Sequence, residues 1–368
     1  MTPRLNAVSA RVYRVTIPLE QPFVLAYKNV SEVENIVLRL QSADGIVGWG
    51  CASPESKVTG ETPDMTAQSL IRDIIPALLS APELPLPLLL DVAEQSAPGA
   101  PAACAAADVA LHDMAARAAR VPLIALLGGP ARDSIPTCMT ISISEVDKTL
   151  DDARRFAARG FRFLKIKCGL DPELDIARVK AVRAALPGAT LHLDANQGYT
   201  REQALLVARA LEHDIVFLEQ PGPKEDLDLL QALCAESPVP IMADEPVLTP
   251  DHALAVFRRG APLVCVKLVK SGGVAPAVRL CELAASLGRG VMIGCMEELP
   301  VSMAAAACVA LSQPAVRYAD LDGHLDMIQD FAHGGIFVNN GDAAVSDAHG
   351  SGVEVNEQAL APHLAFEA

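Results

Sequence analysis

Three acidic residues recur at one interval in the chain, each at the end of a short apolar run. Asp194 in HLDANQ, Glu219 in FLEQP and Asp244 in MADEP follow one another at intervals of 25 residues. Carboxylates gathered at one place repel one another and titrate abnormally unless a cation lies between them. Oxygen ligands without His or Cys at matching positions favour Mg²⁺ over Zn²⁺. The alternative is that each carboxylate caps the helix after its strand, but three in register favour a metal site.

Lysines lie at the ends of two further apolar runs. In KIKCG, strand alternation places Lys165 and Lys167 on one face. In VKLVKSGG the same alternation places Lys270 on the inner face and turns Lys267 outward, where it would pair with Glu245 of the neighbouring strand in a structural role. For a single lysine the alternative is a surface position with its ammonium in water, which fits Lys267 better than Lys167.

A lysine on each face of a metal-held carboxylate substrate suits removal of the proton α to that carboxylate. Lysine titrates near ~10.4 in water, and an adjacent lysine and a dication both lower that pKa toward the range of a base. The metal and a lysine would stabilise the resulting enediolate. A Schiff-base lyase also uses a barrel lysine but needs no three-carboxylate site. A non-catalytic metal-binding barrel is a third reading, and it has no use for opposed lysines.

The elements that must position these residues alternate regularly after about residue 134. Eight short apolar runs, from IPTCMTI to VRYADLD, are separated by seven helical stretches. This alternation predicts parallel β/α units, and eight strands at near-constant spacing favour a closed barrel over an open sheet. The carboxyl ends of barrel strands form the active site, so the acidic residues and lysines would meet there. The second and sixth strands, which carry the lysines, would lie on opposite sides of the ring.

The part before the barrel resembles a small α+β domain. ARVYRVTIP and NIVLRLQS have strand character, and Asp44-Gly45 between two strand patterns predicts a hairpin. The stretches TPDMTAQSLIRDIIPALL and APAACAAADVALHDMAARAAR predict helices. The end of the chain, after residue 330, predicts strands and turns that fold back.

Composition restricts the class of protein. The chain has 368 residues, 51% of them hydrophobic, and a net charge of -15, which argues against a nucleic-acid partner. Nine scattered cysteines without a CxxC motif indicate a reducing, cytoplasmic setting. We expect no signal peptide, because the first residues lack an apolar core region, and no membrane span, because prolines interrupt IPALLSAPELPLPLLLDV.

Taken in order, the motifs KxK, DxN, E, DE and KxxKSGG resemble those of the enolase superfamily, in its muconate-lactonizing-enzyme subgroup. The resemblance covers nearly the whole chain, including DGIVGWG, TGET and PLIALLGG. It implies an α/β fold, with a modified (β/α)7β TIM barrel over residues 126–330, an α+β N-terminal capping domain over 1–125, and a segment over 331–368 that packs back on the capping domain. It also implies an even-numbered homo-oligomer.

The same resemblance implies roles for individual residues. Mg²⁺ would bind to Asp194, Glu219 and Asp244. Lys167 and Lys270 would be the acid/base pair, and Lys165 would support Lys167 and contact the substrate carboxylate. Asn196 matches the second polar member of the family's third-strand motif, and Glu298 matches an acidic position at the seventh-strand end that would hydrogen-bond a catalytic group.

The subgroup contains muconate cycloisomerases, o-succinylbenzoate synthases, N-acylamino-acid racemases and dipeptide epimerases. Asp320 and Asp322 in ADLDGHL resemble the dipeptide epimerase signature, in which two aspartates hold the ammonium of the N-terminal residue. Independently of the family, two carboxylates on one face suit a cation, although a helix cap or loop turn is the alternative. We therefore expect a Mg²⁺-dependent dipeptide epimerase that inverts the α-carbon of the C-terminal residue, with the other three activities as alternatives.

Cues to the preferred side chains conflict. PFVLAYKNVSEVEN resembles the family's mobile capping loop, and Lys28 stands where an alanyl-glutamate epimerase carries an arginine. Lysine supplies charge there but no bidentate fork, so Ala-Glu-like substrates are the expectation. Glu55 and Glu297 would instead face a cationic side chain. Cys51 follows GWG where the family often has Glu.

Overall fold

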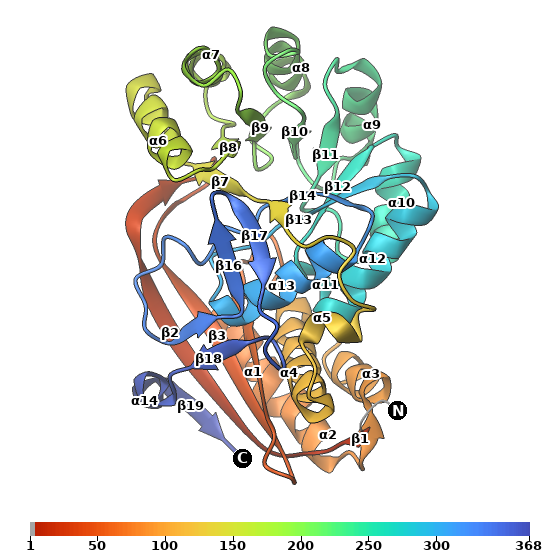
Figure 1. Ribbon diagram of the computed structural model, residues 1–368. Helices are drawn as coiled ribbons and strands as arrows, with labels where there is room; N and C mark the ends of the chain where they lie inside the picture. Colours follow the sequence, from red (N-terminus) through yellow and green to blue (C-terminus); the bar gives the residue numbers. More distant parts are fainter. Residues whose placement is uncertain (1–3) are drawn as a thin grey trace.

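Eight parallel strands form a barrel in the computed structural model, which describes residues 4–368 (Figure 1). The sheet order is β14-β13-β12-β11-β10-β9-β8-β7, and a parallel bridge between Thr137 and Ala319 joins its two edges. The strands are β7 (Cys138–Ile141), β8 (Phe163–Lys167), β9 (Thr190–Asp194), β10 (Leu218–Glu219), β11 (Ile241–Ala243), β12 (Leu263–Val266), β13 (Gly290–Ile293) and β14 (Val316–Ala319). The expected modified TIM barrel is confirmed.

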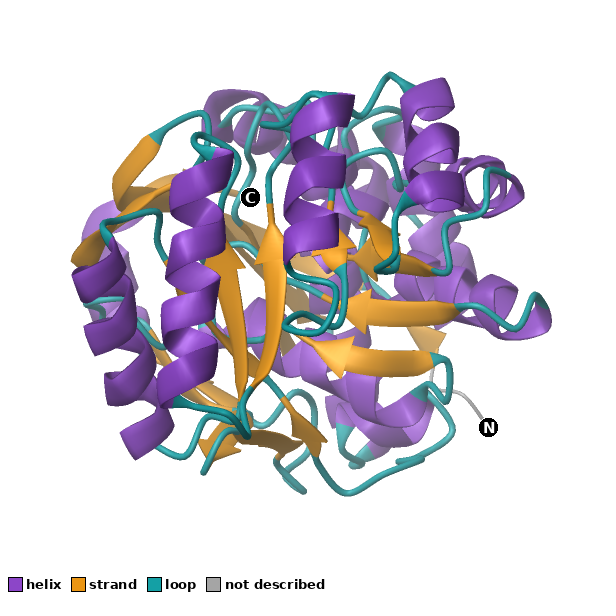
Figure 2. Ribbon diagram, turned by 90° about the horizontal axis from the view of Figure 1, so that it is seen from above, coloured by secondary structure: helices purple, strands orange, loops and turns teal. Residues whose placement is uncertain are grey.

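Helices surround the barrel, one after most strands (Figures 1 and 2). They are α6 (Val146–Ala158), α7 (Pro172–Ala185), α8 (Arg201–Ala210), α9 (Leu227–Glu236), α10 (Pro250–Arg258), α12 (Val274–Ser286) and α13 (Pro300–Ser312). A further short helix, α11 (Leu268–Ser271), lies between β12 and α12. Among the described residues, no helix is both long and apolar enough to cross a membrane.

The expected α+β capping domain is built on a four-stranded antiparallel sheet, lower in Figure 1. Its order is β19-β2-β3-β4, so the last strand of the chain pairs with one of the first. The strands are β2 (Ala7–Val24), β3 (Asn29–Ser42), β4 (Val47–Ala52) and β19 (Leu364–Glu367). The Asp44-Gly45 hairpin joins β3 to β4, and Gly45 adopts the left-handed φ of 81° that this turn requires.

Helices cover one face of this sheet. Those in contact with its strands are α1 (Pro63–Ser69), α2 (Ile75–Ser80) and α4 (Pro101–Ala119). The π-helical turn η1 (Leu70–Ile74), α3 (Leu86–Ser96) and α5 (Leu123–Leu126) pack against α4. A short pair, β1 (Arg4–Leu5) and β5 (Leu84–Pro85), lies beside them. Helix α4 runs so close to β4 that a Cβ at Gly50 would lie 1.8 Å from the carbonyl oxygen of Ala106. The glycines of GWG therefore permit the close approach of a helix.

The C-terminal segment contacts both parts of the molecule. It contains β15 (Ala332–Gly334), β16 (Ile336–Asn339), β17 (Asp342–Val345), β18 (Val353–Val355), α14 (Glu357–Leu360) and the 3₁₀ turn η2 (Ala361–His363). Strand β17 pairs with β6 (Ile135–Pro136) before the barrel, and β19 joins the capping sheet. The buried Asp113 of α4 accepts from Ser351 N at 2.6 Å and Trp49 N at 3.0 Å, which ties this segment to the capping domain.

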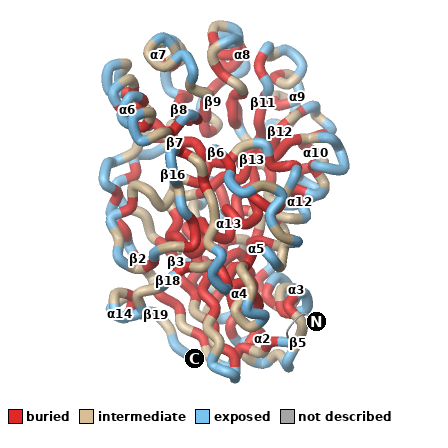
Figure 3. Tube along the Cα trace, in the orientation of Figure 1, coloured by how far each residue is buried: buried red, intermediate tan, exposed pale blue. Residues whose placement is uncertain are grey.

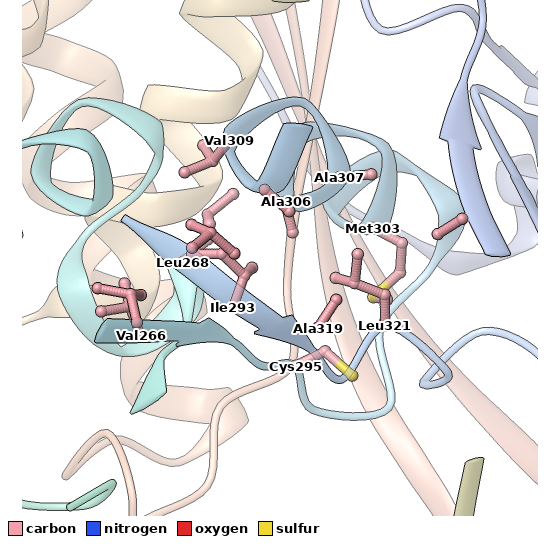
Figure 4. Close-up of a cluster of buried hydrophobic side chains, with 14 of the residues drawn as sticks. Val266, Leu268, Ile293, Cys295, Met303, Ala306, Ala307, Val309, Ala319 and Leu321 are labelled. Atoms are coloured by element: carbon pink, nitrogen blue, oxygen red, sulfur yellow. The ribbon is translucent and has the colours of Figure 1, made fainter. Parts of the chain in front are cut away.

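Buried residues run continuously from the barrel into the capping domain (Figure 3). Every residue of α13 is buried, because this helix lies between the barrel strands and the capping and C-terminal strands. Figure 4 shows Val309 and Met303 of α13 facing Leu268, Ile293 and Leu321. Full burial of such aliphatic side chains contributes about 1.5–3 kcal/mol each, so α13 firmly joins the two parts.

The barrel interior is filled beneath the carboxyl ends of the strands. Phe163, Phe217 and His192 pack together, with ring centroids 4.5 to 6.5 Å apart. Further apolar interior residues are Cys138, Met242, Leu263, Cys265 and Met292. The interior is therefore a packed core, and chemistry is confined to the carboxyl ends of the strands.

Candidate active site

The three predicted acidic residues lie side by side at the carboxyl end of the barrel. Asp194 ends β9 and is the register partner of Glu219, which ends β10, while Asp244 directly follows β11. All three are 0% exposed. One oxygen from Glu219 and one from Asp244 lie within 4.8 Å of each other and of Cys265 Sγ.

These carboxylates do not cap the helices that follow them. The side chains of Thr200, Asp226 and Thr249 accept from the first-turn amides of α8, α9 and α10 respectively. Capping is thus done by residues five to seven positions further on, at the helix starts. The alternative explanation for the three acidic residues is removed.

Within residues 4–368, two of the three carboxylates have oxygens that accept no hydrogen bond, although lysine ammonium groups lie close to them. Among the described residues, neither oxygen of Glu219 accepts a hydrogen bond, nor does Asp244 Oδ2. A buried carboxylate oxygen without a donor is costly. The oxygens of Glu219 and Asp244 that accept no hydrogen bond from the described chain, next to the carboxylate of Asp194, fit a hard divalent cation, which binds carboxylate oxygens.

Lys165 joins this cluster to the predicted DxD pair. Its Nζ lies 3.0 Å from Asp194 Oδ2, 3.1 Å from Glu219 Oε2 and 2.8 Å from Asp320 Oδ2, and the side chain is almost fully buried. Burial alone would raise the pKa of Asp194, but the ammonium groups of Lys165 and Lys167 outweigh burial and hold it well below its ordinary value.

Lys167 faces the cavity from the same strand. Its Nζ donates to Asp194 Oδ2 at 2.7 Å and to Asn196 Oδ1 at 3.0 Å. Asn196 is fixed in turn, because its backbone amide donates to Asp194 Oδ1 at 2.9 Å. Its backbone has a left-handed φ of 41°. Lys165, Lys167, Asp194 and Asn196 are therefore joined in one network of hydrogen bonds and ion pairs.

The expected orientations of Lys267 and Lys270 are wrong. Strand β12 ends at Val266, and Lys267 is already the N-cap of α11, so the alternation of a strand does not extend to either lysine. Lys267 points into the cavity, with Nζ 3.1 Å from Asp244 Oδ2. Glu245 makes no pair with it: neither of its oxygens has a hydrogen-bond partner among the described residues.

Lys270 lies beneath the site and outside the central cavity. It is 0% exposed, and its Nζ donates to Asp244 Oδ1 at 2.5 Å, to the Asp244 carbonyl and to the Cys265 carbonyl at 3.0 Å. It borders a separate cleft of about 680 Å³ between the capping helices and α11. That cleft is larger than the central cavity, but Lys165, Lys167 and Lys267 line the central cavity and not the cleft.

The central cavity lies where the barrel meets the capping domain. Lysines form its floor, and residues of the capping domain form its roof, namely Phe23 at the end of β2 and Tyr27 and Val58 in two loops. The remaining lining residues are Leu25, Thr140, Asn196, Cys295, Met296, Glu297, Asp320 and Asp322. Apolar side chains over a polar floor exclude water and strengthen the electrostatic interactions inside.

The DxD pair stands at one end of this cavity. Both oxygens of Asp320 already accept hydrogen bonds, one from Lys165 Nζ and one from Cys138 Sγ at 3.1 Å. From the described residues, Asp322 accepts only one short hydrogen bond, from Thr140 N at 2.7 Å, with Cys295 Sγ at 3.8 Å from its other oxygen. Burial and the neighbouring Asp320 raise the pKa of Asp322 to about 8. A cation next to Asp322 would relieve both effects.

The residues expected to set side-chain specificity do not all reach the cavity. Lys28 is exposed, forms an ion pair with Glu55 and does not line the cavity. Glu297 lines it, and burial raises its pKa. Glu298 turns back to accept from Met296 N at 3.0 Å, and burial raises its pKa to about 7.

Sequence reasoning missed Asn35, which fixes the loop that carries Glu297. This fully buried residue of β3 donates to the Glu297 carbonyl at 3.0 Å and accepts from Leu299 N at 3.0 Å and Cys51 Sγ at 3.2 Å. Cys51, at the position where a glutamate was expected, thus contacts the same anchor. A polar amide inside an apolar strand, as in ENIVLRL, was the available signal.

Comparison with known proteins agrees with this geometry. Residues 7–128 match the mandelate racemase / muconate lactonizing enzyme N-terminal domain, and residues 148–359 match the enolase C-terminal domain-like family. The chain belongs to this family of the enolase superfamily. Within it, the chain groups with the dipeptide epimerases and is an isomerase that acts on amino-acid derivatives.

Two relatives and one solved structure illustrate the similarity. The L-Lys-D/L-Arg epimerase of Methylococcus capsulatus is 40% identical over 91% of this chain and 95% of its own length. The L-Ala-D/L-Glu epimerase of Bacillus subtilis is 34% identical over 95% of this chain and 97% of its own length. The crystal structure of the Methylococcus capsulatus dipeptide epimerase with Mg and L-Arg-D-Lys has a TM-score of 0.88 and 38% identity, covering 96% of this chain and 100% of that one.

Proposed function

We propose that the protein is a Mg²⁺-dependent dipeptide epimerase that inverts the α-carbon of the C-terminal residue. One observation carries the proposal: Lys167 Nζ is 2.7 Å from Asp194 and Lys267 Nζ is 3.1 Å from Asp244, on opposite flanks of the same carboxylate cluster. Their strands, β8 and β12, are four apart in a ring of eight, hence directly opposite. Epimerisation by two bases needs one base on each face of the α-carbon. Lys167 and Lys267 supply these two bases.

Asp194, Glu219 and Asp244 would hold Mg²⁺. When bound, Mg²⁺ supplies positive charge that stabilises the negative charge developing on the substrate carboxylate. With the carboxylates alone, Asp244 outweighs the lowering effect of burial and raises the pKa of Lys267 well above its ordinary value. Charge neutralisation of the carboxylates removes that attraction, so burial then favours the uncharged amine that a base requires.

The chain's own residues then divide the work. Lys165 binds the substrate carboxylate beside Asp194 and Glu219. Lys167 removes the α-proton from one face, and Lys267 returns a proton to the other. Lys270, which is outside the cavity, supports Asp244 from beneath. Phe23, Tyr27 and Val58 exclude water from the reacting carbon.

Asp322 favours a dipeptide over an N-acylated amino acid. A free N-terminal ammonium would pair with the available oxygen of Asp322. An N-acyl substrate carries no such cation and would leave Asp320 and Asp322 facing a neutral group. The same reasoning argues against o-succinylbenzoate synthesis and muconate cycloisomerisation, whose substrates bring further negative charge.

The acidic end of the cavity favours a cationic N-terminal side chain. Glu297, Asp322 and Asp326 line a small extension with Leu19, Gln21 and Phe23, and no lysine or arginine of the described chain lines it. Lys28 forms an ion pair with Glu55, so it offers little support for a substrate with an acidic side chain such as Ala-Glu. The activity named for the Methylococcus capsulatus relative, on Lys and Arg residues, agrees with this assignment.

The test is deuterium uptake from D₂O by defined substrates, read by mass spectrometry. With Mg²⁺ present, Lys-X dipeptides should gain one deuterium at the C-terminal α-carbon faster than Ala-Glu. N-succinyl-arginine should gain none at a comparable rate. If the N-succinyl compound exchanged faster than the dipeptides, N-acylamino-acid racemisation would be the function supported and dipeptide epimerisation would be rejected. Absence of exchange with every substrate would reject both functions.

A further inference from the structure

A buried arginine outside the cavity binds the backbone of one of the two catalytic lysines. Arg178 of α7 is 0% exposed. Its guanidinium donates to the Lys167 carbonyl at 2.8 Å, the Ser142 carbonyl at 2.7 Å and Thr149 Oγ1 at 2.8 Å. It also donates to Asp175 Oδ1 at 2.9 Å. Four of the five N–H groups of the guanidinium are thus used.

Asp175 extends this unit to the loop after β8. Its second oxygen accepts from Gly169 N at 3.0 Å and from the Tyr199 hydroxyl at 2.7 Å. Gly169 has a φ of 110°, and a Cβ there would lie 2.5 Å from the Ala195 carbonyl. The loop that begins at the end of the catalytic strand is therefore held tightly against the next strand end.

The arginine also fixes the roof of the cavity. Arg178 donates to the carbonyl of Ser142, and the hydroxyl of Ser142 accepts a hydrogen bond from Val24 N at 2.7 Å. The neighbouring Phe23 lines the cavity, and Lys167 Nζ lies 6.0 Å from the centroid of its ring. One guanidinium thus sets the backbone of Lys167 and, through Ser142, the capping loop that lies over it.

Lys267 has no such support within residues 4–368. There, its carbonyl accepts only from its own short helix, from the amides of Lys270 and Ser271 and the Ser271 hydroxyl. Arg178 is on the other side of the ring, next to β7 and β8. The two bases are therefore held by different means, and a defect at Arg178 would affect one face of the substrate.

We propose that Arg178, paired with Asp175, is a positioning residue for Lys167 and for the roof next to it, and not for Lys267, and that it sets the rate of proton transfer on the Lys167 face. The inference rests on the proposed function. A buried arginine with a carboxylate partner that served stability only would affect both faces equally. A positioning role is lost when the planar fork is lost, even if the charge remains.

Arg178→Lys is the decisive variant, and it is placed in two backgrounds. With Lys267→Ala, only Lys167 can exchange the α-proton in D₂O; with Lys167→Ala, only Lys267 can. We expect Arg178→Lys to lower exchange by about 10- to 100-fold in the first background, since small displacements of a reacting group cost that much. In the second background exchange should change by less than about 3-fold.

The matched control is Arg183→Lys on the same helix. Arg183 also donates to backbone carbonyls, those of Pro187, Ala189 and Asp214, but at the opposite end of the barrel. The substitution Arg183→Lys should leave deuterium exchange on both faces of the α-carbon unchanged. Thr149→Val, which removes one acceptor and keeps the Arg178–Asp175 pair, should lower exchange on the Lys167 face several-fold and serves if Arg178→Lys does not fold.

The outcomes separate this inference from the proposed function. Equal losses on both faces, or no loss on the Lys167 face, would overturn the positioning role while leaving the epimerase intact. A wild-type protein that exchanges no dipeptide at all would remove both.

Discussion

Lys267 and Lys270 both contact Asp244, but only Lys267 does so from the cavity. Lys267 Nζ lies 3.1 Å from Asp244 Oδ2, whereas Lys270 Nζ lies 2.5 Å from Oδ1 and beneath it. One carboxylate thus separates a lysine that can reach a substrate from one that cannot. The two lysines should consequently respond to substitution in different ways.

Lys267→Ala should abolish net epimerisation yet leave a folded protein that exchanges deuterium into one diastereomer. Lys167→Ala should do the same with the other diastereomer, because each lysine serves one face. NMR of each variant with each diastereomer in D₂O measures this. Near-normal epimerisation by either variant would contradict a two-base mechanism.

Lys270→Ala should act through stability instead. It removes one partner of a buried ion pair and leaves the carbonyls of Asp244 and Cys265 without that donor, so we expect a loss of about 3–5 kcal/mol in the free energy of unfolding. Urea denaturation measures the loss. A fully stable but inactive Lys270→Ala protein, together with an active Lys267→Ala protein, would restore Lys270 as the base.

How far the sequence predicts this site depends on how far each inference relies on strand periodicity. Asp194, Glu219 and Lys167 end regular strands, so alternation and spacing are enough to bring them together. Lys267 and Lys270 lie past the end of β12, where a helical turn replaces the strand. The glycines of KSGG were the signal, since Gly272 and Gly273 have φ of 98° and 119° and mark a turn there.

Other features depend on partners far away in the sequence. The substrate contact predicted for Lys28 relies on its match to an arginine position of alanyl-glutamate epimerases, whereas its ion pair with Glu55 forms only where two capping loops meet. Arg178 lies in PELDIARVKAVRAAL, which predicts a helix. Helical periodicity says nothing about a guanidinium that turns inward to bind the end of a neighbouring strand.

Glu219→Gln should uncouple the protein from Mg²⁺ without unfolding it. Glu219 accepts no hydrogen bond from the described residues, and the ion-pair partner it would lose, Lys165, keeps Asp194 and Asp320. The loss of stability in EDTA should therefore be smaller than the roughly 3–5 kcal/mol of a fully broken buried ion pair. Saturating Mg²⁺ at about 100 times its dissociation constant should stabilise the wild type by about 2.7 kcal/mol, and this gain should vanish in the variant. The exposed Asp251→Asn is the control. An unchanged Mg²⁺-dependent gain in melting temperature would contradict the metal assignment.

Glu297→Gln and Asp326→Asn should raise KM for Lys-X dipeptides by about 10-fold and change it little for Ala-X, since each removes a charge from the acidic end of the cavity. Lys28→Ala should leave both classes unchanged. Steady-state kinetics on matched substrate pairs measures the difference. A selective rise in KM for Ala-Glu in Lys28→Ala would instead restore Lys28 as a side-chain ligand.

The junction between the capping domain and the barrel should weaken as pH rises. His112 of α4 is buried, with Nδ1 3.0 Å from Asp108 Oδ1, and Asp108 in turn accepts from Val274 N at 2.6 Å at the start of α12. Burial lowers the pKa of His112, but Asp108 outweighs it and raises the pKa above its ordinary value of about 6.5. The folded state therefore binds the proton more tightly than the unfolded state, and this contribution is complete below about pH 6.5 and is lost as pH rises through the folded pKa. Urea denaturation at pH 5.5 and 8.5 should show a larger fall in the free energy of unfolding for the wild type than for His112→Gln. The control variant His213→Gln, at an exposed histidine, should behave as the wild type does. If the wild type and His112→Gln showed the same pH dependence, the His112–Asp108 pair would not stabilise the junction through its charge.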